Sequence, residues 1–175
     1  MVKRIVTKIG DIFRVELIDS PQWGIVQGKK YLRFFQYIAN DMTCLNSSVI
    51  RVFKKKYPIE YIFNAEEIIN DEIDFYAHTV LKLGIVENFW QKIGKSRDVG
   101  DTEHIFFRTY THDAVNHRKR KWQMWQINKE WEPIGFLTPY YRSMSDLGDV
   151  FPYKSIVERM KTGQYPGTMF SPEEY

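Results

Sequence analysis

Two histidines and a basic run lie close together in the second half of the chain. His112 and His117 are followed directly by four cations, Arg118, Lys119, Arg120 and Lys121. Paired imidazoles can act as general acid and general base, and neighbouring cations can stabilise charge that develops on a phosphodiester. Segment 112–121 is therefore a candidate phosphate-binding or catalytic loop of a hydrolase or nuclease. A solvated hairpin tip is the alternative interpretation.

A cluster of carboxylates lies nearer the middle of the chain. Five acidic residues fall within a short stretch: Glu66, Glu67, Asp71, Glu72 and Asp74. Such a cluster can speed the encounter with a basic partner surface and contribute to specificity, so these are candidate partner-binding residues. The alternative is a capped helix start followed by a polar turn. Asn64 can accept hydrogen bonds from the first turn, and Glu67 is spaced to complete a capping box.

No other pattern in the sequence indicates catalysis, a metal or a cofactor. The spacing of His78, His104 and the two loop histidines matches no zinc motif, and the glycines form no phosphate-cradling loop. Cys44, the single cysteine, has no local signature of a nucleophile and is expected to pack as a small apolar side chain. We therefore expect no catalytic residue outside the 112–121 loop, no metal site and no cofactor.

Composition restricts the classes of partner. The net charge of +3 disfavours a nucleic-acid partner. Trp122 and Trp125 could stack bases, but on a strand they point to opposite faces. No run approaches the roughly 18 apolar residues of a membrane span, so no membrane partner is expected. A single cysteine and the lack of a signal-peptide pattern favour a reducing, cytoplasmic location.

The chain has the length and balance of one globular domain. It has 175 residues, of which 43 % are hydrophobic and 27 % charged. Aromatic residues make up 16 %, which favours β-sheet and equally suits an interface, so it does not decide the oligomeric state. Alternating apolar residues and turn signals predict short strands over 11–17, 23–27, 31–39, 49–53, 73–82, 85–93, 104–110, 122–127 and 131–137.

Two helices complete the expected fold. One is short and begins after Asn64, and a helix over 75–81 is a rival to part of the strand over 73–82. The other follows residue 152, where apolar side chains recur at helical spacing, and Gly163 is placed to end it. We expect an α+β, mainly-β fold with an antiparallel barrel- or sandwich-like sheet. Residues 1–140 form the core domain, and 141–175 a C-terminal helix and tail packed on it.

Three segments resemble a known family. They read Lys8-Ile9-Gly10-Asp11-Ile12-Phe13-Arg14-Val15-Glu16-Leu17, Trp23-Gly24-Ile25-Val26 and Trp90-Gln91-Lys92-Ile93-Gly94. This pattern resembles the immunity protein 26 family of bacterial polymorphic toxin systems, over about the first 95 residues. A Gly-Asp start to a strand is also seen in small SH3-like barrels, including toxin endonucleases.

The resemblance implies a binding function. Its relatives are encoded beside polymorphic toxins, so the implied task is to bind and neutralise a cognate toxin protein. Some relatives carry a phosphotriesterase label, but this sequence has no metal-ligand pattern that would support it. The alternative remains a hydrolase or nuclease that uses the loop 112–121.

Overall fold

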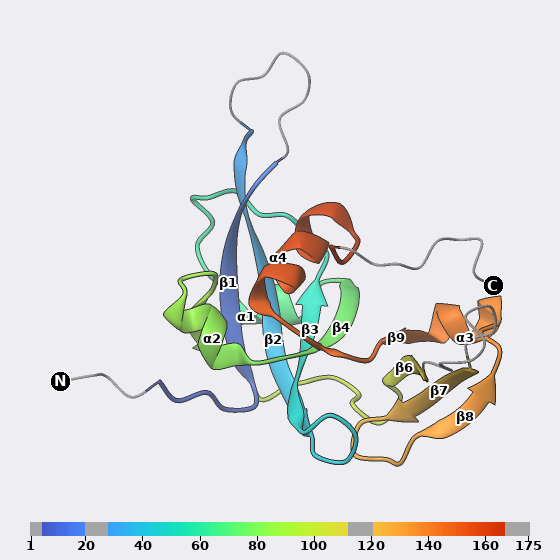
Figure 1. Ribbon diagram of the computed structural model, residues 1–175. Coiled ribbons are helices and arrows are strands. Elements are labelled where there is room, and N and C mark those ends of the chain that lie inside the picture. The colour runs from blue at the N-terminus through green and yellow to red at the C-terminus, as the bar shows by residue number, and fades with distance from the viewer. Residues whose placement is uncertain (1–4, 20–27, 112–120, 167–175) are drawn as a thin grey trace.

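The computed structural model describes residues 5–19, 28–111 and 121–166 (Figure 1). Within these ranges the secondary structure elements, in chain order, are β1 (Asp11–Ile18), β2 (Lys30–Asp41), β3 (Ser47–Phe53), α1 (Ala65–Ile69), β4 (Ile73–Thr79), α2 (Leu81–Val86), β5 (Gln91–Lys95), β6 (Phe106–Thr111), β7 (Lys121–Gln126), β8 (Glu132–Gly135), α3 (Pro139–Met144), β9 (Ser145–Leu147), β10 (Val150–Phe151) and α4 (Tyr153–Thr162). The strand predicted over 23–27 lies outside the described residues.

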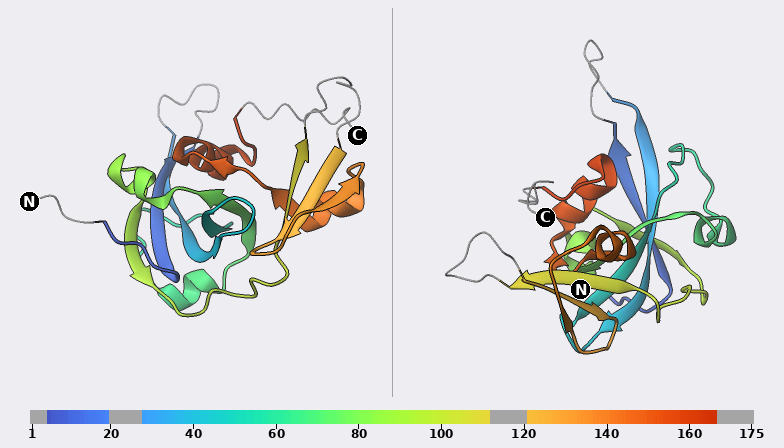
Figure 2. Two further views of the ribbon diagram at one scale, coloured as in Figure 1. Left: turned by 60° about the horizontal axis from the view of Figure 1, so that its bottom comes forward. Right: turned by 90° about the vertical axis from the view of Figure 1, so that its right-hand side faces the viewer.

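The strands form two sheets that stand side by side (Figure 2). A six-stranded sheet has the order β10-β4-β3-β2-β1-β5, and a four-stranded sheet has the order β8-β7-β6-β9. Only β10 with β4 and β6 with β9 pair in parallel. The mainly-β α+β class with a short helix and a C-terminal helix is confirmed. In the portion β4-β3-β2-β1-β5, consecutive strands pair antiparallel, and the chain returns through α2 so that β5 pairs with β1.

Both faces of the six-stranded sheet are buried. On one face, α4 covers a cluster to which β1 contributes Phe13, Val15 and Leu17, as the alternation predicts (Figure 1). On the opposite face, Ile68 of α1 packs on Ile12 of β1. A third cluster joins the two sheets and contains Ile38, Val49, Ile105, Phe107, Trp125 and Ile127.

The C-terminal helix α4 forms where the apolar stripe predicts it. Ile156, Val157 and Met160 are buried against the six-stranded sheet. Gly163 follows the helix with φ +81°, a left-handed conformation that favours glycine. The guanidinium of Arg33 on β2 donates a hydrogen bond of 2.6 Å to the carbonyl of Met160. The last turn of α4 is therefore tied to the sheet by a buried cation.

The predictions for the segment after β4 are partly wrong. The strand over 73–82 is confirmed as β4, which ends at Thr79, and the rival helix over 75–81 is not formed. The strand over 85–93 is wrong in its first half, because α2 covers 81–86 and β5 begins only at Gln91.

Tertiary packing explains why α2 replaces the predicted strand. Gly84 lies against the indole of Trp90 so closely that a Cβ there would be 2.1 Å from an indole carbon. Nε1 of Trp90 also donates a hydrogen bond of 2.9 Å to the carbonyl of Leu81. The buried indole thus holds the helical turn in place, and this contact leaves no periodic signal in the sequence.

In the second half of the chain, β6, β7 and β8 confirm the strands over 104–110, 122–127 and 131–137. β6 begins later than predicted because His104 lies in a turn, where its Nδ1 is 2.5 Å from Oδ2 of Asp101. The sequence pattern did not predict α3, β9 or β10. The last two have three and two residues, too few to show an alternation.

Candidate functional site

The acidic segment begins on α1. Oδ1 of Asn64 accepts hydrogen bonds from the backbone N–H groups of Glu66 and Glu67, at 3.1 and 3.4 Å. The expected N-cap is therefore present. The capping box is not, because the carboxylate of Glu67 accepts from Lys55 Nζ and Tyr61 Oη, both at 2.8 Å.

The rest of the acidic segment is also matched with cations. Glu72 pairs with Lys54 at 2.8 Å, and Asp74 pairs with the buried guanidinium of Arg33 at 2.6 Å. Asp71 accepts a hydrogen bond from the backbone N–H of Lys55. Hydrogen bonds and charge from Lys55 also lower the pKa of Glu67. Glu67 and Glu72 therefore lie among lysines in a region of mixed charge, whereas Asp74 lies beside Arg33 and lines a different cavity.

The candidate catalytic loop falls mostly outside the described residues. His112, His117, Arg118, Lys119 and Arg120 are not among them, and Lys121 is the exposed first residue of β7. The two histidines that the structure does describe lie elsewhere: His104 is exposed in a turn, and His78 is buried.

A buried polar cluster, which the sequence did not indicate, surrounds His78. Its Nε2 lies 3.0 Å from Oδ2 of Asp41, and the same oxygen accepts a hydrogen bond of 2.8 Å from Nε1 of Trp125. Burial lowers the pKa of His78, although the bond to Asp41 opposes this. Because a carboxylate oxygen accepts, Nε2 is the donor in this hydrogen bond. Asp41 and His78 have no exposed surface, so the cluster joins the sheets and does not offer itself to a substrate.

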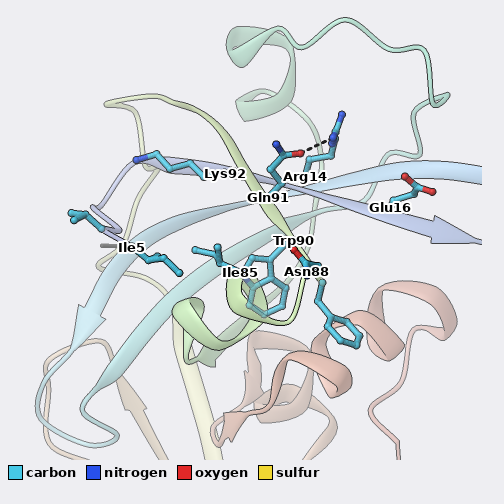
Figure 3. Close-up of a pocket in the computed structure, with 10 residues that line it drawn as sticks. Ile5, Arg14, Glu16, Ile85, Asn88, Trp90, Gln91 and Lys92 are labelled. Atoms are coloured by element: carbon cyan, nitrogen blue, oxygen red, sulfur yellow. Dashed lines mark hydrogen bonds between the residues drawn. The ribbon is translucent and has the colours of Figure 1, made fainter. Parts of the chain in front are cut away.

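A groove of about 760 Å³ has a lining of both polar and apolar side chains (Figure 3). It lies where the chain before β1, the strands β1 and β5, and the turn after α2 meet. Volumes of a few hundred to a thousand Å³ are typical of ligand sites. The lining residues are Ile5, Val6, Arg14, Glu16, Ile85, Asn88, Phe89, Trp90, Gln91 and Lys92.

Its walls have different chemistry. On the strand side, Arg14 donates a hydrogen bond of 2.7 Å to Oε1 of Gln91 (Figure 3). On the α2 side, Ile85 and Phe89 are partly buried and supply an apolar wall. Asn88 makes the turn between these sides with φ +59°, a conformation that asparagine tolerates well.

The groove is bordered by an edge of the six-stranded sheet. β5 pairs with β1 on one side only, and no strand among the described residues pairs with its outer side. The neighbouring helix α2 also exposes Leu83 and Val86, at 51 % and 58 %. An open strand edge beside apolar and charged side chains is suited to hold an extended peptide segment.

The described residues contain no group of three or more histidine, cysteine, aspartate or glutamate side chains that could hold a metal ion. No helix in this part of the chain is long and apolar enough to cross a membrane. Comparison with protein-family models, with curated proteins and with solved structures finds no match.

Proposed function

We propose that this chain is a bacterial immunity protein that binds a cognate polymorphic-toxin protein in the cytoplasm and neutralises it without catalysis. One observation carries the proposal. Segments 8–17 and 90–94, which resemble the immunity protein 26 family, pair in space as β1 and β5. Both contribute side chains to the groove, among them Arg14 and Glu16 from the first segment and Gln91 and Lys92 from the second.

The mechanism is occlusion of a toxin surface. An extended toxin segment adds to the open edge of β5 through main-chain hydrogen bonds, the mode called β-augmentation. An apolar toxin side chain packs against Ile85 and Phe89, and an acidic one reaches Arg14. Main-chain pairing supplies affinity and the groove supplies specificity.

The acidic segment is a second, weaker contact in this proposal. Its carboxylates already have cationic neighbours, so they act on the rate of encounter more than on affinity. Glu66 is exposed on α1, where a basic toxin surface can reach it.

Co-expression with the toxin encoded by the neighbouring gene tests the function. We expect the wild-type chain to restore growth and to form a complex with the toxin. Arg14→Glu reverses a charge in the groove, and we expect it to weaken the complex at least tenfold. Arg97→Glu is the matched control, because Arg97 is exposed after β5 and does not line the groove.

The outcomes separate the function from its site. If the wild-type chain neither restores growth nor binds the toxin, the immunity function is wrong. If it does both but Arg14→Glu behaves like Arg97→Glu, the groove is not the contact. If instead His112→Ala or His117→Ala abolishes rescue while the complex persists, the chain acts as a hydrolase through the 112–121 loop.

A further inference from the structure

A second cavity lies at the opposite end of the six-stranded sheet from the groove. It has a volume of about 340 Å³ and is lined by residues of β4, β6, β9, α3 and α4. Three arginines from three different elements line it: Arg108 of β6, Arg142 of α3 and Arg159 of α4. The volume suits a small molecule and exceeds what a single ion needs.

Two of the neighbouring cations are balanced by carboxylates. Arg159 donates a hydrogen bond of 2.8 Å to Oδ1 of Asp146, and its guanidinium lies 4.0 Å from the centre of the Phe75 ring. Arg33 pairs with Asp74 at 2.6 Å. Each of these two arginines therefore has a carboxylate within ion-pair distance.

Arg108 makes no ion pair with a carboxylate among the described residues, although the charge of Asp146 acts on it. Its Nη1 donates to main-chain carbonyls of Arg142 and Ser145 and to Oγ of Ser145, which fixes the guanidinium. Its Nε is buried and has no hydrogen-bond partner among the described residues. Nε and Nη2 form the edge of a guanidinium that binds two oxygens of one anion.

The electrostatic environment of Arg108 agrees with this geometry. Burial lowers the pKa of Arg108 to about 10, against the opposing charge of Asp146 and with smaller contributions from Arg142 and Arg159. The folded chain therefore holds a fixed, partly desolvated cation that an incoming anion would stabilise.

We propose that this arginine cavity binds the phosphate group of a small molecule, with Arg108 as its main ligand and Arg142 at its entrance. A phosphate carries more negative charge than a carboxylate at neutral pH and offers three oxygens to converging arginines.

Isothermal titration calorimetry of the whole chain tests the site, with inorganic phosphate and phenyl phosphate as probes at constant ionic strength. We expect saturable binding of one equivalent. Arg108→Lys keeps the charge but removes the two-donor edge, and we expect at least tenfold weaker binding. Arg97→Lys is the matched control at an exposed position and leaves affinity unchanged.

The two probes distinguish the source of the phosphate. Tighter binding of phenyl phosphate indicates a phosphate monoester, and binding of inorganic phosphate alone indicates free phosphate. If Arg108→Lys lowers the melting temperature, Arg142→Gln replaces it, with an expected weakening of about threefold to tenfold. The proposal is overturned if neither probe saturates, or if affinity is the same in the cavity variants and the control.

Discussion

Asp41 accepts a hydrogen bond of 2.8 Å from Nε1 of Trp125, and this bond joins the end of β2 in one sheet to β7 in the other. Both residues are buried. The same carboxylate also accepts from Nε2 of His78 and from the backbone N–H groups of Cys44 and Asn128. One carboxylate therefore satisfies donors from three parts of the chain: the turn after β2, the strand β4 and the β7–β8 hairpin. It is a polar connection between the sheets.

Replacing this carboxylate should strongly destabilise the fold. Asp41→Ala leaves the donors of Trp125 and His78 buried without an acceptor, and losses from breaking a buried pair are about 3–5 kcal/mol. We expect a decrease of this size in the free energy of unfolding, measured by urea denaturation. Asp101→Ala is the control, because it removes a carboxylate that bonds an exposed histidine. A loss below about 1 kcal/mol for Asp41→Ala would contradict this role.

Stability should also fall as the pH decreases below neutrality. Burial lowers the pKa of His78, so between its folded pKa and the unfolded value of about 6.5 the unfolded chain binds a proton that the folded chain does not. This contribution is complete above about pH 6.5 and is lost towards lower pH, by at most about 1.4 kcal/mol per pH unit.

Asp41 adds to the same trend at lower pH. Burial acts to raise its pKa, but the hydrogen bonds from Trp125, His78 and backbone amides outweigh burial and lower it. Its contribution is therefore present above about pH 3.9 and is lost as the pH falls through the folded pKa. Urea denaturation midpoints measured between pH 7.5 and 5.5 isolate the contribution of His78. In this range the midpoint of His78→Gln should change less with pH than that of the wild type. Equal slopes in the variant and wild type would refute this assignment.

The contact between Gly84 and Trp90 gives a third prediction. Alanine has the higher helix propensity, by about 1 kcal/mol, so an isolated α2 would gain from Gly84→Ala. In the folded chain, however, the new Cβ would lie 2.1 Å from the indole. We expect overpacking to prevail and to lower the free energy of unfolding by about 1–3 kcal/mol, measured by thermal or urea denaturation. Lys82→Ala, an exposed change in the same helix, should stay within about 0.5 kcal/mol. Stabilisation by Gly84→Ala would show that the indole moves freely.

Local patterns were sufficient to predict much of the fold. β1 and α4 each bury one periodic face, so alternation and helical spacing reveal them directly. The α2 turn depends on Trp90 and a close glycine contact, and β9 and β10 depend on the edges of strands far away in the chain. Such long-range contacts are decided by tertiary packing, which a single sequence does not encode as a period.

The candidate sites could be predicted less well for the same reason. The segments around Arg14 and Gln91 were recognised by resemblance, but only the pairing of β1 with β5 shows that they share a groove. The arginine cavity left no motif at all, because Arg108 and Arg159 are 51 positions apart and come from different elements. The acidic residues were predicted as a cluster, but the ion pair between Glu72 and Lys54 was not.

The buried guanidinium of Arg33 should control how firmly α4 is held. Its three nitrogens donate to the carbonyl of Phe53, the carbonyl of Met160 and the carboxylate of Asp74. A cation at the end of a helix also interacts favourably with the helix dipole. Arg33→Met keeps most of the side-chain volume but leaves these acceptors without a donor. We expect the free energy of unfolding to fall by about 2–4 kcal/mol.

Hydrogen exchange distinguishes this role from general destabilisation. If Arg33 anchors the last turn of α4, the amides near Met160 should lose more protection in Arg33→Met than the amides of β2 and β3, because the helix end detaches before the sheet unfolds. Lys30→Met is the control on the same strand, since its ion pair with Glu16 is exposed and worth little. Equal loss of protection in helix and sheet would mean that Arg33 stabilises the core as a whole and does not anchor α4.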